Sequence, residues 1–133
     1  PAAGFVNEAG SIVVGVVAGI VCYLAVSVKF KLGYDDSLDV VAVHMVGGIV
    51  GALLTGVLAL DYINPLGRGV VQGNIKQLGI QALGVGATLL YSGVVTAIIA
   101  TVVKALVGLR VDKEAETTGL DLAEHKEQAY VMQ

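Results

Sequence analysis

Three long apolar segments dominate this sequence and limit the folds open to it. They lie at about 11–28, 40–60 and 78–107. Because about 20 mostly apolar residues in a helix cross the hydrocarbon core of a bilayer, each segment is long enough to span a membrane. The third contains a charge-free run at 78–103, roughly 39 Å of helix, which predicts a tilted span or one that extends beyond the core. The sequence therefore predicts an all-α, polytopic transmembrane helix bundle with short polar loops.

The composition supports a membrane protein and excludes other classes. Apolar residues make up 56% of the chain and charged residues 14%, a balance that soluble domains rarely show. The net charge of −3 comes from the end of the chain, because residues 1–109 hold five basic and five acidic side chains and residues 110–133 hold three and six. The sequence offers no basic face for nucleic acid. A single cysteine, Cys22, excludes a disulfide framework and a cysteine metal site, and no cofactor is predicted.

Motifs that accompany enzymatic chemistry are missing from the sequence. It contains no His-Glu-x-x-His metal motif, no Gly-x-Ser-x-Gly turn, no glycine loop with a lysine for phosphate, and no paired aspartates inside the apolar segments. We therefore predict that the protein is not an enzyme.

Positive charges between the spans predict the orientation of the chain. With three crossings, the loop at 29–38 and the segment after residue 109 lie on the same side of the membrane. Cytoplasmic sides of membrane proteins carry the excess of lysine and arginine, and this side has five basic residues against two in the loop at 61–77. Residues 110–133 are thus predicted to form a cytoplasmic C-terminal tail at a plasma or bacterial inner membrane. The residues compared are Lys29, Lys31, Lys104, Arg110 and Lys113 on one side, and Arg68 and Lys76 on the other.

The first eight residues contain neither an initiator methionine nor the basic and apolar regions of a signal peptide. We expect them to be the end of an earlier element followed by a short loop, and the chain to be the later piece of a longer protein. A small membrane protein that has been processed or trimmed is the alternative.

Small residues recur at helical spacing in two of the spans. Gly15 and Gly19 lie in the first, and Gly47, Gly51 and Thr55 in the second. Such faces allow helices to pack closely in lipid. We interpret them as packing faces, and their number favours either partner helices outside this sequence or an oligomer.

His44 is the strongest candidate for a functional residue. It lies just over one turn into the second span, where an ionisable group is costly unless it faces protein or water. Imidazole offers one donor and one acceptor and changes its charge near neutral pH. With Val40 at i−4 and Gly47 at i+3, its face is predicted to be narrow and mostly apolar. A histidine that is hydrogen-bonded to a neighbouring helix is the structural alternative.

Two acidic positions suit helix starts. Asp39 begins the second span, where a carboxylate accepts free N–H groups, and is predicted to be a cap. In the tail, Asp121 and Glu124 have the spacing of a capping box that starts a short helix through Tyr130, with Gly119 in the preceding turn. A solvated and partly disordered tail is the alternative.

Three motifs resemble the ammonium transporter family, in its Amt/Mep branch. The segment from Asp35 to Gly56, which includes His44, resembles the family's penultimate-to-last helix signature. The opening Pro1-Ala-Ala-Gly4 is similar to the turn after its eighth helix. Gly108-Leu-Arg-Val111, then Gly119 to His125 and Ala129-Tyr130, are similar to its cytoplasmic C-terminal motif.

The resemblance implies an eleven-helix homotrimer in which each subunit has its own pore for ammonium or ammonia, with this chain supplying helices nine to eleven. It implies that His44 is the second of two hydrogen-bonded pore histidines and that Val40 lines the inner pore wall. The first histidine, an outer aromatic site and a phenylalanine gate would belong to the N-terminal remainder of the transporter.

The resemblance also implies a tail that docks beneath the pores, touches a neighbouring subunit and couples gating to a PII-type regulatory protein. Gly119, Asp121, His125 and Tyr130 would belong to that regulatory tail. Two other functions stay open. One is a small structural or accessory membrane subunit, and the other is a channel for another small neutral solute such as water or carbon dioxide.

Overall fold

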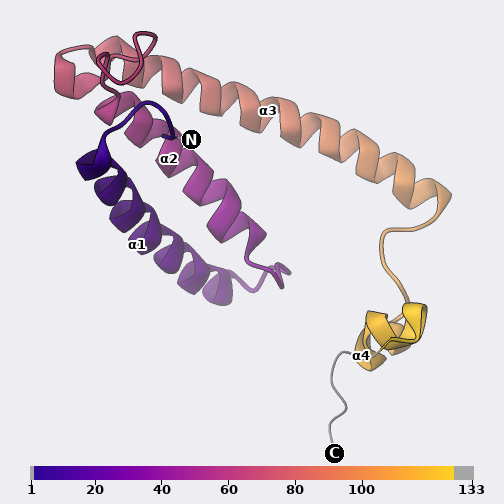
Figure 1. Ribbon diagram of the computed structural model, residues 1–133. Coiled ribbons are helices and arrows are strands. Elements are labelled where there is room, and N and C mark those ends of the chain that lie inside the picture. The colour runs from indigo at the N-terminus through magenta and orange to yellow at the C-terminus, as the bar shows by residue number, and fades with distance from the viewer. Residues whose placement is uncertain (1, 128–133) are drawn as a thin grey trace, which may run out of the picture. The chain divides into compact units, whose positions relative to one another are not determined.

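The computed structural model describes residues 2–127, and all regular structure in that range is helical (Figure 1). By their contacts the residues divide into two compact units, Pro1–Leu90 and Tyr91–Gln133. Three helices are long and apolar enough to cross a membrane: Glu8–Leu32, Val40–Leu58 and Ile75–Leu106. The prediction of an all-α chain with three membrane-length helices is confirmed.

Helix α1, Glu8–Leu32, extends beyond the predicted apolar segment at both ends because flanking residues cap it. At its start, the Asn7 side chain accepts a hydrogen bond of 2.9 Å from the backbone N–H of Gly10. At its end, Gly33 has a φ of 68°, and its N–H donates to the carbonyl of Lys29. Glycine adopts this left-handed conformation without the cost that a Cβ brings, which makes it a frequent helix terminator.

The second membrane-length helix consists of two parts. A π-helical turn, η1, covers Val40–Met45, and helix α2, Val46–Leu58, follows without a break. In Figure 1, α1 and α2 lie side by side and run in opposite directions. Their contact includes Cys22 and Gly47, since a Cβ added at Gly47 would lie 3.1 Å from the Cys22 sulfur.

Backbone hydrogen bonds fold the connection after α2 against the N-terminal segment. The N–H of Leu60 donates to the carbonyl of Phe5 at 2.9 Å, and the N–H of Gly69 donates to the carbonyl of Ala59 at 2.8 Å. A 3₁₀ turn, η2, follows at Val70–Gln72. The loop is therefore an ordered cover for this end of α2.

Helix α3, Ile75–Leu106, is the longest element, and its first part, 75–90, belongs to the first unit. There it approaches α2 closely at Gly56. A Cβ added at Gly56 would lie 3.1 Å from the Cα of Leu78 and 3.3 Å from the carbonyl oxygen of Gln77. Glycine at this position permits backbone contact between the helices.

The second unit contains the rest of α3 and a short helix that the sequence analysis did not predict. Helix α4 covers Lys113–Thr118, and the Asp112 carboxylate caps it by accepting a 2.8 Å hydrogen bond from the N–H of Ala115. Arg110 forms an ion pair with Glu116 of α4. A π-helical turn, η3, follows at Asp121–His125.

The capping box predicted in the tail is wrong. The residue before η3 is Leu120, and no side chain caps the turn. Asp121 lies inside the turn, because the chain is already helical at Leu120. Lys126, with a φ of 55°, ends the turn well before Tyr130. Tyr130 itself lies outside the described residues.

Few apolar side chains are covered by this chain itself. Within residues 2–127 the buried hydrophobic residues are Ala2, Ala42 and Ala59, whereas many large side chains on α1 and α3 are exposed. Apolar surface of this extent marks contact with lipid or with other protein. For helices of this length it fits a membrane.

Candidate functional site

His44 lies in η1, two residues before Val46, the first residue of α2. Its imidazole is exposed, as is Val40 at the start of the same turn. The N–H of Val46 donates to the carbonyls of Val41 and Val43, so the π geometry extends through Met45 and the α geometry begins at Val46. Single π turns are rare in proteins, and those that do occur are often found at functional sites. The regular α-helical spacing assumed around His44 does not hold within this turn.

The cap predicted at Asp39 is wrong, because Asp36 caps the turn instead. The Asp36 carboxylate accepts hydrogen bonds from the N–H groups of Val40, at 2.8 Å, and Val41, at 2.9 Å. Asp39 makes no side-chain cap and has a left-handed backbone with a φ of 54°. Its carboxylate is instead bound to Lys29 of α1.

Lys29 joins α1 to the chain that leads into η1. Its ammonium group forms an ion pair with Asp39 and donates a 2.8 Å hydrogen bond to the backbone carbonyl of Asp36. The ammonium also lies 4.9 Å from the centre of the Phe30 ring, a distance at which a cation is attracted to an aromatic face. Lys29 is only 8% exposed, and it is the one charged residue that is buried within the described chain.

Small residues make a second contact between α1 and the chain around His44, and others lie elsewhere on α1 and α2. The Cys22 thiol donates to the carbonyl of Val43 at 3.8 Å, one residue before His44, and Gly47 lies against the same sulfur. Further along α2, Gly51 and Thr55 are buried, and the Thr55 hydroxyl donates to the Gly51 carbonyl at 2.7 Å. Gly15 and Gly19 have open space where a Cβ would lie.

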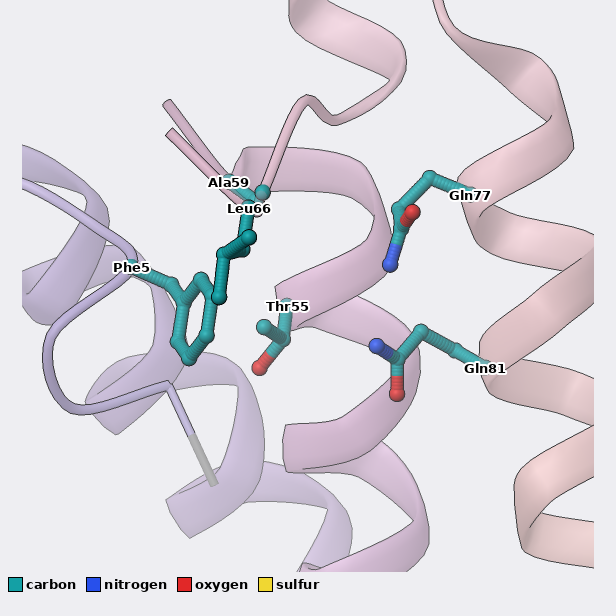
Figure 2. Close-up of a pocket in the computed structure, with 7 residues that line it drawn as sticks. Phe5, Thr55, Ala59, Leu66, Gln77 and Gln81 are labelled. Carbon is teal, nitrogen blue, oxygen red and sulfur yellow. The ribbon is translucent and has the colours of Figure 1, made fainter. Parts of the chain in front are cut away.

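A cavity of about 210 Å³ lies at the opposite end of α2 from His44. Figure 2 shows the Phe5 ring and Leu66 on one side and the amides of Gln77 and Gln81, from α3, pointing toward Thr55. His44 is eleven residues before Thr55, roughly 16 Å along a helix, so the two sites are separate. The cavity is lined by Phe5, Thr55, Ala59, Leu66, Gly67, Gln77 and Gln81.

Sequence reasoning missed this cavity and the role of Lys29. The signal for the cavity is a pair of glutamines one helical turn apart at the start of an apolar helix, since polar groups at such positions need a polar neighbour. Lys29 entered the sequence analysis only as a positive charge near a loop. No sequence pattern within α1 distinguishes the buried Lys29 from the exposed Lys31. The reason is that the partners of Lys29 lie in the segment after α1, at Asp36 and Asp39.

The predicted tail residues lie in the second unit. Gly119 has a φ of 100°, and Asp121 and His125 are exposed in η3. No group of three His, Cys, Asp or Glu residues suited to a metal ion occurs in the range that the structure describes.

The three membrane-length helices and the uncovered apolar surface define an α-helical, multi-pass membrane protein. A sequence model of the Ammonium Transporter Family matches residues 1–130. The chain is 49% identical over 137 residues to an ammonium transporter of Mycobacterium tuberculosis, covering 98% of this chain and 29% of the relative. It is 53% identical over 131 residues to an ammonium transporter of Aquifex aeolicus, covering 98% and 30%.

Solved structures give the same assignment. The chain is 38% identical to Saccharomyces cerevisiae Mep2, with a TM-score of 0.77 over 86% of this chain and 27% of that one. Candida albicans Mep2 is 37% identical, with a TM-score of 0.76. This chain belongs to the ammonium transporter family, and it spans about a third of the length of the curated relatives it matches. The names of these relatives describe transporters, in agreement with the prediction that the chain is not an enzyme.

Proposed function

We propose that this chain is the C-terminal part of an ammonium transporter and forms one side of a pore for ammonium or ammonia. The observation that carries the proposal is the likeness of the chain, over nearly its whole length, to relatives named as ammonium transporters. The exposed imidazole of His44, in a π turn beside α2, supports a role in that pore. The first eight helices and the first pore histidine come from the N-terminal remainder of the transporter.

The chemistry of His44 suits this substrate. Moving a bare ammonium ion into an apolar pore is costly because the ion loses its hydration. Ammonia without the extra proton is small and neutral and needs only a hydrogen-bond partner. A neutral imidazole supplies one donor and one acceptor, and Val40 at the start of the same turn supplies apolar lining. We therefore infer that His44 binds the substrate as ammonia, in a pair with the histidine of the N-terminal part.

The assembly that we propose is a homotrimer in a cell membrane, with a cytoplasmic tail. The open faces at Gly15 and Gly19 and the exposed side chains of α1 and α3 are suited to contact with other helices or lipid. The tail, with α4 and η3, carries surface for a neighbouring subunit and for a PII-type regulatory protein. Gly119, Asp121, His125 and Tyr130 belong to this proposed surface.

Uptake of labelled methylammonium into proteoliposomes, with ammonium as competitor, tests the proposal. The proteins compared are this chain alone and the chain joined to its N-terminal part, each with and without His44→Ala. We expect transport by the joined protein alone. Leaving a polar group without its hydrogen bond in a dry site costs about 1–3 kcal/mol, so His44→Ala is expected to reduce uptake by about five- to hundredfold.

Met45→Leu is the matched control, since Met45 is the next residue in the turn and the substitution keeps its volume. It is expected to retain uptake. If the joined protein assembles but moves no methylammonium, the transport proposal fails and an accessory subunit takes its place. Uptake that ammonium does not compete with, or that is independent of His44, points to a channel for another neutral solute.

A further inference from the structure

We propose that Lys29 is a positioning residue for His44, acting through the ion pair with Asp39. This inference rests on the proposed role of His44 in transport. Lys29 lies near the end of α1, fifteen residues before His44 in the chain, and does not belong to the turn that carries the imidazole. It binds Asp36 and Asp39, whose oxygen atoms accept the first hydrogen bonds of this turn.

The charge of Lys29 is buried. Lys29 is 8% exposed, whereas Lys31, two residues further along α1, is exposed. A charge with little access to water is stable in a protein when it is paired and hydrogen-bonded. Lys29 meets this condition through Asp39 and the carbonyl of Asp36. The position of the Asp36–Asp39 segment is thereby tied to α1.

Asp36 and Asp39 connect the segment held by Lys29 to η1. Asp36 uses its carbonyl to bind Lys29 and its carboxylate to accept the N–H groups of Val40 and Val41. Asp39 supplies the carbonyl that accepts the N–H of Val43 at 2.8 Å. The first hydrogen-bonding groups of the turn therefore belong to the two residues that Lys29 holds.

Asp39 has a left-handed backbone conformation. A left-handed φ of 54° is uncommon for a residue other than glycine and needs support from its surroundings. The ion pair with Lys29 supplies this support. Without Lys29, Asp39 keeps a strained backbone and an unpaired carboxylate beside an apolar helix, and both are relieved if the segment moves. Such a movement changes the start of η1 and with it the direction of the His44 imidazole.

The experiment uses the joined protein in proteoliposomes and compares Lys29→Met with Lys31→Met. Both substitutions remove one positive charge from the same end of α1, and only the first breaks the contact with Asp39. Small errors in site geometry cost large factors in rate, so Lys29→Met is expected to lower the maximal uptake per assembled molecule about tenfold with little change in KM. Lys31→Met is expected to stay within about twofold, as exposed substitutions usually do.

A double variant, Lys29→Met with Asp39→Leu, removes both charges and leaves no unpaired carboxylate, so it is expected to assemble even where Lys29→Met does not. It is still expected to be slow, because nothing holds the start of η1. Wild-type uptake per assembled molecule in either Lys29 variant overturns the proposal.

Amide hydrogen exchange at residues 40–46 gives a readout that does not depend on transport. We expect exchange roughly tenfold faster in the double variant and unchanged in Lys31→Met, because loss of the tie to α1 makes local opening easier. Unchanged exchange in the double variant also overturns the proposal. If the unsubstituted protein moves no methylammonium, the proposed function fails, and the exchange result still decides whether Lys29 positions this turn.

Discussion

The two ends of α2 are held in different ways. At the His44 end, the contacts with α1 are made by side chains of α1: the Lys29 ammonium, which binds Asp39 and the Asp36 carbonyl, and the Cys22 thiol. At the far end, backbone atoms make the close contacts of α2: with α3 at Gly56 and with the following loop at Gly69. Side-chain contacts can be released and remade with little movement of the helices, whereas backbone contacts cannot. The far end therefore acts as the fixed support and the His44 end as the adjustable one.

This difference fits the proposed function. A pore histidine needs an exact direction, which side chains from another helix can provide without a fixed backbone contact. The far end needs no such adjustment, and glycines there let three segments of backbone approach one another. Substitutions at the far end are thus expected to affect folding, and those at the His44 end to affect transport.

Gly69→Ala is the strongest test of the fixed end. A Cβ at Gly69 would lie 2.5 Å from the carbonyl oxygen of Val57 and 2.8 Å from the backbone nitrogen of Ala59. Neither atom can move without disturbing α2, so the cost is expected at the upper end of the usual range for overpacking, about 3 kcal/mol or more. Thermal unfolding and size-exclusion chromatography of the joined protein in detergent measure the loss.

Gly48→Ala is the matched control, because the space beside Gly48 is open within the described chain. It is expected to keep the melting temperature near that of the unsubstituted protein. A Gly69→Ala protein as stable as this control contradicts the idea of a rigid end.

Gly56→Ala tests the same end with a smaller expected effect. The added Cβ would meet the Cα of Leu78 at 3.1 Å and the side chain of Gln81 at 2.9 Å. Because the glutamine side chain can move aside and the α3 backbone can shift by a few tenths of an ångström, we expect a loss of about 1–2 kcal/mol. Uptake per assembled molecule is expected to stay unchanged, and a selective loss of uptake with normal stability contradicts the division between the two ends.

The sequence predicts the three spans and singles out His44, but it does not predict the turn that contains His44. The three spans follow from the length of the apolar segments, which is a local property, and their observed bounds differ from the predicted ones by a few residues. Helix α1 is longer at both ends, where Asn7 and Gly33 cap it, whereas the other two helices end at Leu58 and Leu106 rather than at 60 and 107. His44 is singled out by its chemistry alone, since imidazole is rare and costly inside an apolar segment. These features require no knowledge of the surrounding structure.

The turn around His44 is not predictable in the same way. Asp36 and Asp39 are both carboxylates near a helix start, and local rules favour the nearer one as the cap. The structure has the opposite assignment because Lys29, from another helix, binds Asp39. The same local rule predicts Asp121 as a cap in the tail, and it fails because the backbone is already helical at Leu120. In both cases contacts or backbone geometry beyond the motif decide the outcome.

The smallest predicted effect sharpens the comparison at the adjustable end. Gly47→Ala brings a Cβ to 3.1 Å from the Cys22 sulfur, which is the end of a side chain and can turn aside. Alanine is also more favourable than glycine in a helix, by up to about 1 kcal/mol. This gain offsets the cost of the close contact, so the net change in the free energy of unfolding is expected to lie within about 0.5 kcal/mol. In a Cys22→Ala background the contact is gone, and Gly47→Ala is expected to stabilise the protein by about 0.5–1 kcal/mol. A double-mutant cycle of unfolding free energies measures this coupling. A coupling energy of zero shows that the Cys22 thiol and a side chain at position 47 do not interact. If Gly47→Ala instead lowers the free energy of unfolding by several kcal/mol, the His44 end of α2 is as rigid as the far end.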